Sequence, residues 1–390
     1  MLSVAAAAEI INRYWPPGGV AWGQLADLPR GVLAESVTAD RDYPPGDRVM
    51  MDGIALLHST YSNGQRSFPV LGTIAAGDTP VSLTDPFACW EVMTGALLPP
   101  PADLVIPYED ITLVQEVAQV TQDRQRQPLE FVHRQGSDCL SGAEILPAGT
   151  PLNGPIWGIL ASLGKTQVKL TANPRIQIIA TGDELVSVEQ IPQAQQLRCS
   201  NVYALQASLQ HRGFSHITLA HLADDPLAIR QHYQQATSIY DVLIYSGGIS
   251  RGKFDYLPSL WQEMGAELYI QGVAQKPGKP LCFGIDNAQQ TLIVGLPGNP
   301  VSSLICLHRY FLPNPLIYAQ LATEVKLDKP LTYFLPVKLI YTEKGTLKAT
   351  PLPMQNSGDF IALAPSDGFL ELPPGPRVFS AGECFRFFAW

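Results

Sequence analysis

The feature that most constrains the fold is a set of three glycine-rich loops, each of which follows a short apolar, β-branched segment. Segment 240–245 is followed by Ser246-Gly247-Gly248-Ile249-Ser250, segment 266–270 by Lys276-Pro277-Gly278-Lys279-Pro280, and segment 291–296 by Pro297-Gly298-Asn299-Pro300. A strand, a glycine loop and a helix in succession form an anion site in parallel sheets, because glycine lets backbone N–H groups approach a phosphate. Three such loops close together indicate a binding site rather than packing alone.

Size and charge limit the possible functions. At 390 residues the chain is too long for one hydrophobic core, so two to four domains are expected. The formal net charge of −9 argues against nucleic acid or an anionic membrane as a partner, since both favour a basic surface. No apolar run approaches the ~18 residues of a membrane span. The first residues indicate an amphipathic helix and not a signal peptide, and the six scattered cysteines suit a reduced compartment, so we expect a cytoplasmic protein.

The segment from 174 to 323 alternates apolar runs with helical patterns. This rhythm predicts an α/β domain with a mostly parallel sheet. Its clearest helix begins at Ser200 or Asn201, places Val202, Leu205 and Leu209 on one face, and ends at Gly213. Asp224-Asp225-Pro226 opens a second helix, with proline at the first position.

The rest of the chain predicts β-rich structure around this domain. Residues 46–139 show short alternating runs broken by glycine and proline, which predict an inserted β-rich domain. Residues 1–45 and 140–173 would form one discontinuous linking domain. Residues 324–390 return to short strands and predict a C-terminal β-barrel.

Sequence order places several polar residues at one edge of the predicted sheet. The carboxyl ends of parallel strands lie together, which would bring one set of side chains to a single crevice: Glu184, Asp224, Asp255, Lys276, Lys279 and Asn299. Carboxylates beside a phosphate-binding loop would repel the ligand unless a cation intervenes, and Mg²⁺ is the usual one. The two lysines could neutralise the remaining negative charge.

Each of these signals also has a purely structural explanation. Ser-Gly-Gly is often only a turn, and Asp225 before Pro226 is most simply a helix cap. Glu184 could be a first-turn acid favoured by the helix dipole. Asp52 and Asp138, each beside a glycine or serine, could be turn residues. The joint occurrence of the loops at one sheet edge nevertheless favours a binding site.

Taken together, these loops resemble the molybdopterin molybdenumtransferases, the family of the bacterial MoeA proteins and of the E domain of gephyrin. Upstream segments follow the order of that family: Met51-Asp52-Gly53, Met93-Thr94-Gly95-Ala96, Gly136-Ser137-Asp138, Ala148-Gly149-Thr150 and Thr181-Gly182-Asp183-Glu184-Leu185. The resemblance covers nearly the whole chain. It implies four domains and a homodimer whose cleft lies between the α/β domain of one subunit and the β domains of the other. It also implies a reaction of adenylylated molybdopterin with molybdate and Mg²⁺ that yields molybdenum cofactor and AMP.

The resemblance also implies roles for individual residues. Glu184, Asp224 and Asp255 would surround the Mg²⁺ ion, and Lys276, Lys279 and Ser302 would bind molybdate and the pterin phosphate. Asp52, Thr94 and Asp138 would reach in from the inserted β-rich domain. The catalytic residues are then Asp52, Asp138, Glu184, Asp224, Asp255, Lys276 and Lys279. The residues expected to bind the pterin ligand are Thr94, Ser246, Gly247, Gly248, Ser250, Pro297, Gly298, Asn299, Pro300 and Ser302. A molybdopterin adenylyltransferase is the expected donor of the substrate.

The chain departs from the family pattern at several positions. Val49, Cys199, Gly272, Pro336 and Ala362 stand where the family commonly has serine, aspartate, lysine, arginine and serine, and Ile54 replaces an aromatic residue. Pro336 and Ala362 would belong to the molybdate side of the pocket. These departures support a second hypothesis, a non-catalytic molybdopterin-binding paralogue that stores or transfers the cofactor. A third and weaker hypothesis is a pure scaffold.

Overall fold

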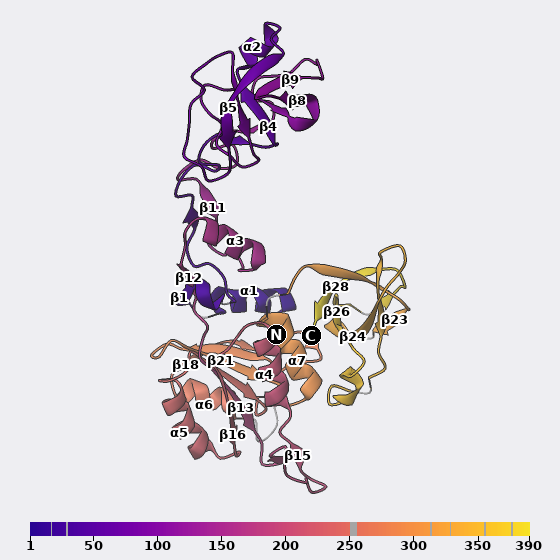
Figure 1. Cartoon of the computed structure of the whole chain (residues 1–390). Coiled ribbons are helices and arrows are strands. Elements are labelled where there is room, and N and C mark those ends of the chain that lie inside the picture. The colour runs from indigo at the N-terminus through magenta and orange to yellow at the C-terminus, as the bar shows by residue number, and fades with distance from the viewer. Residues whose placement is uncertain are drawn as a thin grey trace. The chain divides into compact units, whose positions relative to one another are not determined.

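The computed structural model describes residues 1–16, 18–28, 30–249, 256–312, 314–327, 329–354, 356–375 and 377–390. The chain divides into two compact units. One unit consists of Met1–Ala21 together with Thr171–Trp390, and the other is Trp22–Leu170. Strands β1 (Val20–Gln24) and β12 (Gln167–Thr171) lie at the two points where the chain passes between the units. Each unit is shown in Figure 1.

The unit Trp22–Leu170 is built on a six-stranded sheet with the order β7-β4-β6-β5-β9-β8. Its strands are β4 (Gly53–Leu56), β5 (Ser67–Ile74), β6 (Cys89–Val92), β7 (Leu104–Pro107), β8 (Ile111–Val114) and β9 (Val117–Val120), with the short helix α2 (His58–Ser62) after β4 and η2 (Tyr108–Asp110) after β7. Because side chains alternate along a strand, Ile54 and Leu56 pack in one core and Ala55 in the other. The predicted β-rich domain is confirmed.

A third core in this unit joins segments from before and after the sheet. It contains Leu33 and Leu146 together with Leu160 of helix α3 (Gly154–Ser162). Asn153 caps this helix by accepting a hydrogen bond from the Ile156 N–H at 3.1 Å. The remaining short elements of the unit are η1 (Leu25–Asp27), β2 (Val37–Thr38), β3 (Arg48–Val49), β10 (Val132–His133) and β11 (Glu144–Leu146), in which β2 pairs with β11 and β3 with β10. The limits of the four predicted domains stay a prediction.

The larger unit contains a six-stranded sheet with the order β16-β13-β17-β21-β20-β18. Its strands are β13 (Ile176–Thr181), β16 (Ile217–Leu222), β17 (Val242–Ser246), β18 (Ala266–Gln271), β20 (Cys282–Asp286) and β21 (Thr291–Leu296). Strands β16, β13, β17 and β21 are parallel, whereas β20 is antiparallel to both of its neighbours. The sheet is therefore mostly parallel, as predicted.

Helices cover both faces of this sheet (Figure 1). One core combines the sheet with α1 (Val4–Tyr14), α4 (Asn201–His211) and α7 (Pro300–Tyr310), and the other combines it with α5 (Pro226–Ala236) and α6 (Leu257–Glu263). Alternate residues of β13 separate the two cores, since Ile178 and Ala180 face the first and Ile179 the second. The predicted helix after Ser200 buries Val202, Leu205 and Leu209, which confirms its apolar face.

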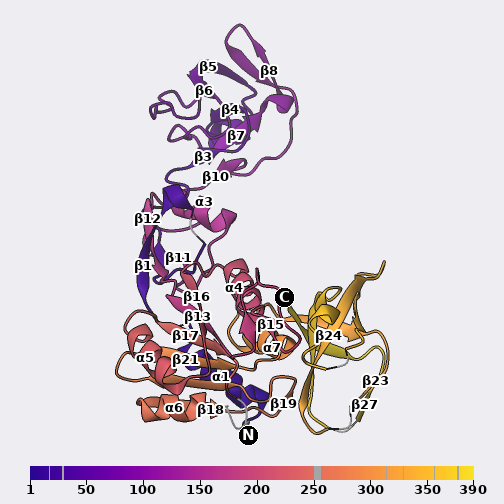
Figure 2. The ribbon, with the colours of Figure 1, turned by 90° about the horizontal axis from the view of Figure 1, so that it is seen from below.

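The C-terminal segment closes into a five-stranded barrel. Strands β24 (Thr332–Tyr341), β25 (Leu347–Pro351), β22 (Ile317–Leu321), β28 (Cys384–Ala389) and β26 (Gly368–Leu372) pair in that order, and β26 pairs back to β24. The accessory elements of this region are β19 (Gln275–Lys276), β23 (Val325–Leu327), β27 (Arg377–Phe379) and η3 (Ile361–Leu363), with β19 added to β24 and β23 paired with β27 (Figure 2). The predicted barrel is confirmed.

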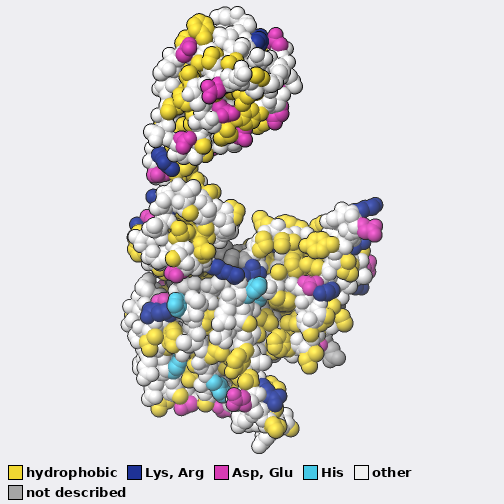
Figure 3. All heavy atoms as spheres, viewed as in Figure 1, with side chains coloured by type: hydrophobic (Ala, Val, Ile, Leu, Met, Phe, Trp, Pro, Cys, Tyr) yellow, Lys and Arg dark blue, Asp and Glu magenta, His cyan; other side chains and the backbone are white. Residues whose placement is uncertain are grey.

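The barrel is not separated from the α/β core. Phe334, Phe369 and Phe388 of the barrel strands belong to the same core cluster as the strands and helices of the α/β sheet. The barrel also carries exposed large apolar side chains, and Figure 3 shows hydrophobic side chains gathered on its visible face. The exposed large apolar residues of this region are Leu316, Tyr318, Ile340, Tyr341, Ile361 and Val378. Among the described residues, none of the helices combines the length and apolar character that a membrane crossing requires.

Candidate functional site

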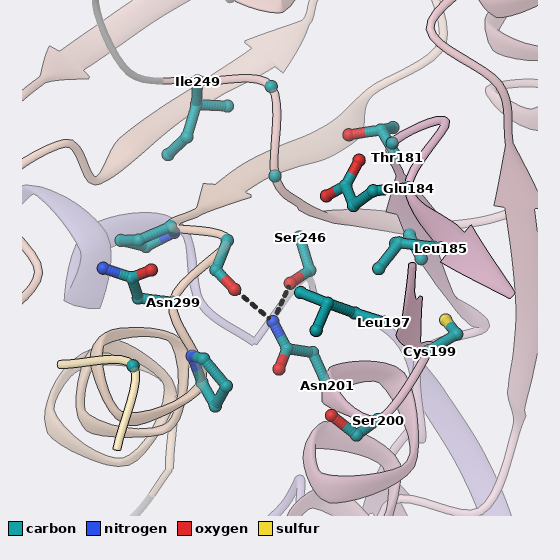
Figure 4. A pocket seen from close by; sticks show the side chains of 18 of the residues that line it. Thr181, Glu184, Leu185, Leu197, Cys199, Ser200, Asn201, Ser246, Ile249 and Asn299 are labelled. Carbon is teal, nitrogen blue, oxygen red and sulfur yellow. Dashed lines mark hydrogen bonds between the residues drawn. The ribbon is translucent and has the colours of Figure 1, made fainter. Parts of the chain in front are cut away.

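A cavity of about 760 Å³ lies in the larger unit, beside the carboxyl ends of β13, β17 and β21. Figure 4 shows its lining. Of the residues predicted from the sequence, the lining contains Glu184, Asp224, Ser246, Gly247, Gly248, Pro297, Gly298, Asn299 and Pro300. The edge of the sheet at which the strands end therefore brings together two of the predicted acids and two of the three glycine loops, as expected for open α/β sheets.

The loop after β17 requires glycine at two consecutive positions. Gly247 has a φ of +110°, and a Cβ atom there would lie 2.8 Å from the carbonyl oxygen of Thr181. Gly248 has a φ of +65°, and its Cβ atom would lie 2.8 Å from the Leu257 side chain. Residues with a side chain rarely adopt such positive φ values, and a Cβ atom at either position would clash. Only glycine therefore lets this loop lie between β13 and the cavity.

Asn201 joins this loop to the loop after β21. Its side-chain nitrogen Nδ2 donates to Ser246 Oγ at 2.9 Å and to the carbonyl oxygen of Gly298 at 2.7 Å (Figure 4). The two loops also touch, since a Cβ atom on Gly298 would lie 3.6 Å from the Cα atom of Gly247. One amide at the start of α4 thus fixes both phosphate-type loops relative to each other.

The barrel supplies another part of the cavity wall. Asn299, the residue before α7, donates from Nδ2 to Ser357 Oγ at 2.8 Å, and the Val301 N–H of α7 donates to the Ser357 carbonyl oxygen at 3.2 Å. Gly358 and Phe360 of the same segment line the cavity. The N-terminus of α7 is therefore already partly satisfied by the barrel, although helix N-termini are favourable anion sites.

The two acids in the lining come from different loops. Glu184 folds over Gly182, since a Cβ atom added to Gly182 would lie 2.5 Å from Glu184 Oε2. Asp224 is held by its backbone N–H, which donates to Asp183 Oδ1 at 3.0 Å. Asp225 caps α5 through a 3.0 Å hydrogen bond from the Leu227 N–H, which agrees with its interpretation as a helix cap.

The acidic side chains of the cavity suit an Mg²⁺ ion whose remaining coordination positions are filled by a bound ligand. Among the described residues no group of three or more histidine, cysteine, aspartate or glutamate side chains is arranged to hold a metal. Mg²⁺ needs only one or two protein carboxylates when phosphate oxygens supply further ligands, and Glu184 and Asp224 line the same cavity. Asp255, the third predicted metal ligand, and Ser250 lie outside the described residues.

The lysine loop is not brought into the cavity with the other two loops. Of the segment 276–280, the lining contains only Pro280. Lys276 belongs to β19, which pairs with β24, and its ammonium lies 5.3 Å from the ring centre of Tyr333. Gln275 fastens the loop to α7 by donating to the Gly278 carbonyl oxygen at 3.2 Å and accepting from the Tyr310 hydroxyl.

Lys279 and Ser302 are likewise not among the lining residues. Ser302 lies in the first turn of α7 and is buried, with 3% of its surface exposed. Sequence order alone places the lysines beside Glu184, because it does not show that the lysine loop pairs with the barrel.

The remaining predicted residues belong to the unit Trp22–Leu170. Asp52 Oδ1 accepts hydrogen bonds from the N–H and the hydroxyl of Thr94, both at 2.6 Å. These bonds lower the pKa of Asp52 from its usual value, with the hydroxyl as the largest cause. Asp138 Oδ1 lies 2.7 Å from His133 Nε2. Asp52 and Thr94 thus form one polar pair, and Asp138 belongs to another.

The departures from the family pattern have distinct surroundings. Cys199 lines the cavity, and burial raises the pKa of its thiol, so a neutral group stands where the family often has a carboxylate.

The other departures lie outside the cavity lining. Val49 is packed in a core of the β-rich domain. Gly272 has a φ of +98°, which disfavours the lysine common in the family. Pro336 lies in β24 opposite Phe369, and Ala362 lies in η3, close in sequence to the lining residue Phe360.

Among the lining residues that were not predicted as site residues, Asn201, Phe360 and Thr181 are the most informative. Asn201 was interpreted only as a possible cap, and Phe360 carries no local motif. Thr181 belongs to one of the segments that follow the family order, but the resemblance implies no role for it. Its hydroxyl is buried and has no hydrogen-bond partner among the described residues. A polar residue directly after a buried strand is the one local signal that could have identified Thr181.

The fold and the cavity define an α/β protein with a pocket of two glycine loops and two acids at the carboxyl edge of its sheet. Three family models match consecutive parts of the chain: the MoeA N-terminal region (domain I and II) at residues 2–164, a "probable molybdopterin binding domain" at 177–316, and the MoeA C-terminal region (domain IV) at 318–390. The chain belongs to the MoeA family of molybdopterin molybdenumtransferases.

Individual relatives agree with this assignment. The molybdopterin molybdenumtransferase of Synechocystis is 58% identical over 390 residues, which cover 100% of both chains. That of Bacillus subtilis is 28% identical and is matched over 98% of this chain and 92% of its own length. The crystal structure of the molybdopterin biosynthesis MoeA protein of Pyrococcus horikoshii has a TM-score of 0.81 at 21% identity, with full coverage of both chains. The last similarity supports the fold alone.

Proposed function

We propose that the protein is a molybdopterin molybdenumtransferase that inserts molybdate into adenylylated molybdopterin and releases AMP in the biosynthesis of the molybdenum cofactor. The observation that carries this proposal is the cavity in which Glu184 and Asp224 stand beside the Ser246–Gly248 and Pro297–Pro300 loops. Two acids beside two phosphate-type loops suit a metal-bridged phosphate ligand better than a neutral one. The 58% identity to the Synechocystis molybdopterin molybdenumtransferase supports the same activity.

The chain's own residues would bind and orient the ligand. Gly247 and Gly248 allow the backbone to approach a phosphate, and Ser246 offers a hydroxyl in the same loop. Glu184 and Asp224, with Asp255 as the predicted third acid, would hold the Mg²⁺ ion. When bound, Mg²⁺ supplies positive charge against the charge that develops on the phosphate as AMP leaves. Lys276, Lys279 and Ser302 remain proposed ligands of molybdate, although the cavity lining does not contain them.

Turnover of the purified full chain tests the activity. Adenylylated molybdopterin, molybdate and Mg²⁺ are supplied, and the release of AMP is followed. We expect AMP release that requires all three components. A verified substrate that gives no AMP above background would contradict the proposal.

The alternative is a non-catalytic paralogue that binds and hands on molybdopterin. Cys199 favours it, because a neutral thiol lines the cavity where the family often has an acid. This alternative predicts tight binding of molybdopterin without AMP release, so a binding measurement on the same sample separates the two functions.

We also propose a homodimer, supplied with substrate by a molybdopterin adenylyltransferase. Exposed apolar residues such as Tyr318, Tyr341 and Ile361 give the chain surface that a second copy could cover. The molar mass in solution, measured by light scattering, should be about twice the 42.4 kDa of one chain. A monomer at micromolar concentration would contradict this proposal.

A further inference from the structure

The amide of Asn201 has only one possible orientation. One of its terminal atoms lies 2.7 Å from the carbonyl oxygen of Gly298, and a carbonyl oxygen can only accept a hydrogen bond. The atom that faces it must therefore be the nitrogen Nδ2, a choice that asparagine side chains often leave open. The second hydrogen of the same nitrogen points to Ser246 Oγ at 2.9 Å.

This orientation determines what Ser246 can do. Because Nδ2 has no lone pair to offer, the Ser246 hydroxyl must accept from Asn201, and its own proton is directed elsewhere. Among the residues that the structure describes, Asn201 is the sole hydrogen-bond partner of Ser246 Oγ. Ser246 is buried, with 3% of its surface exposed, and it lines the cavity. Within the described part of the chain, the proton of this buried hydroxyl therefore has no acceptor, and burial makes an unpaired donor costly.

We propose that Asn201 is a positioning residue that keeps Ser246 Oγ as a hydrogen-bond donor toward the cavity and so selects a phosphate oxygen as its partner. The inference deepens the proposed function, on which its choice of a phosphate-bearing ligand rests. A phosphate oxygen only accepts hydrogen bonds, so it fits a hydroxyl that is held as a donor. The same amide holds the Gly298 carbonyl oxygen, which keeps this second loop in contact with Gly247.

The substitution Asn201→Asp reverses this polarity with little change of shape. A carboxylate would accept the Ser246 proton and would repel the Gly298 carbonyl oxygen. AMP and inorganic pyrophosphate serve as phosphate-bearing probes and adenosine as the neutral one, each titrated calorimetrically into the full chain. We expect Asn201→Asp and Ser246→Ala each to weaken AMP binding about 10-fold or more, as for a hydrogen bond to a charged group. Adenosine binding should change less than about twofold, whereas a general collapse of the site would weaken both ligands.

A double-mutant cycle separates the hydroxyl from the added charge. If Asn201 acts through Ser246, Asn201→Asp should cost less than about threefold in AMP affinity once Ser246→Ala is present. Asn299→Asp is the matched control, because it adds the same charge to the same cavity while its side chain contacts Ser357 and not Ser246. Its effect should be the same with and without Ser246→Ala.

Several outcomes would overturn the inference. One is an equal loss from Asn201→Asp in both backgrounds, which would assign the effect to charge alone. Another is unchanged AMP affinity of Ser246→Ala, which decides the matter even if Asn201→Asp fails to fold. The third is that the unmodified protein binds neither AMP nor pyrophosphate. Since none of these titrations needs turnover, they are independent of the AMP-release test of the proposed activity.

Discussion

Thr94 holds the carboxylate of Asp52 through two donors at once. The backbone N–H and the hydroxyl of Thr94 both reach Asp52 Oδ1 at 2.6 Å. Each bond favours the charged carboxylate, so the pKa of Asp52 lies below its usual value. The pair therefore stabilises the fold at neutral pH, and this contribution is lost as the pH falls through the lowered pKa.

Thr94→Ala should raise the pKa of Asp52 without restoring its ordinary value. The substitution removes the hydroxyl, which is the largest cause of the lowering, and leaves the backbone N–H in place. The pKa of the Asp52 carboxyl can be followed by an NMR titration of the unmodified and substituted proteins. An identical pKa in both would show that the hydroxyl does not act on this carboxylate.

His308 predicts a loss of stability in mild acid. It is buried, with Nδ1 at 2.9 Å from the Ala389 carbonyl oxygen and Nε2 at 3.0 Å from Ser208 Oγ, and burial lowers its pKa to about 4. The unfolded chain binds a proton near pH 6.5 and the folded chain only near pH 4, so stability falls between these values. Relative to His308→Gln, the free energy of unfolding should drop by about 2–3 kcal/mol between pH 7 and pH 4.5. If the urea midpoints of the unmodified protein and of His308→Gln shifted equally between the two pH values, this prediction would be contradicted.

Gly247→Ala should damage the cavity more than an ordinary glycine substitution. Its Cβ atom would lie 2.8 Å from a backbone oxygen of Thr181, in addition to the strain of a φ of +110°. We expect a loss of about 2–4 kcal/mol in unfolding free energy and loss of AMP binding. Gly345→Ala is the control, because it has a φ of +75° but open space around it, so it should cost about 1 kcal/mol. Equal losses would mean that the contact with Thr181 is not tight.

Asp255→Asn tests the predicted metal site. The substitution keeps the size of the side chain and removes one charge, so we expect normal folding and AMP release that falls by orders of magnitude at limiting Mg²⁺. Asp225→Asn is the control, since Asp225 caps α5 and should affect stability by about 1 kcal/mol at most. Near-normal AMP release by Asp255→Asn at limiting Mg²⁺ would remove Asp255 from the metal site.

Restoring two residues common in the family tests whether their absence limits molybdate binding. Pro336→Arg together with Ala362→Ser returns a cation and a hydroxyl to positions in β24 and η3. If their absence limits molybdate binding, the double variant should reach half-maximal AMP release at a lower molybdate concentration. The same molybdate dependence in both proteins would show that these two departures do not limit the reaction.

Local patterns predicted most of the architecture. The apolar run of β13, the periodic apolar face of α4 and the glycines after β17 each depend on neighbouring residues, so the α/β domain and two loops of the site could be inferred. The role of Asp225 as a helix cap could also be predicted from the sequence, because capping depends on only a few consecutive residues.

Contacts between distant segments could not be inferred in this way. Asn201 contacts residues 45 and 97 positions further along the chain, and Ser357 contacts Asn299 from another domain. The lysine loop pairs with β24, which sequence order gives no reason to expect. Such contacts depend on tertiary packing, which cannot be predicted from the conformational preferences of neighbouring residues.

The bond between Val301 of α7 and Ser357 of the barrel also bears on how such proteins can evolve. A helix whose first N–H group is satisfied by another domain, within a core shared with Phe334 and Phe369, cannot exchange that domain freely. Recombination between homologues near residue 317 would separate partners that have adapted to each other. The α/β domain and the barrel are therefore expected to be inherited as one block, and chimaeras joined at that point should fold poorly even when each parent is sound.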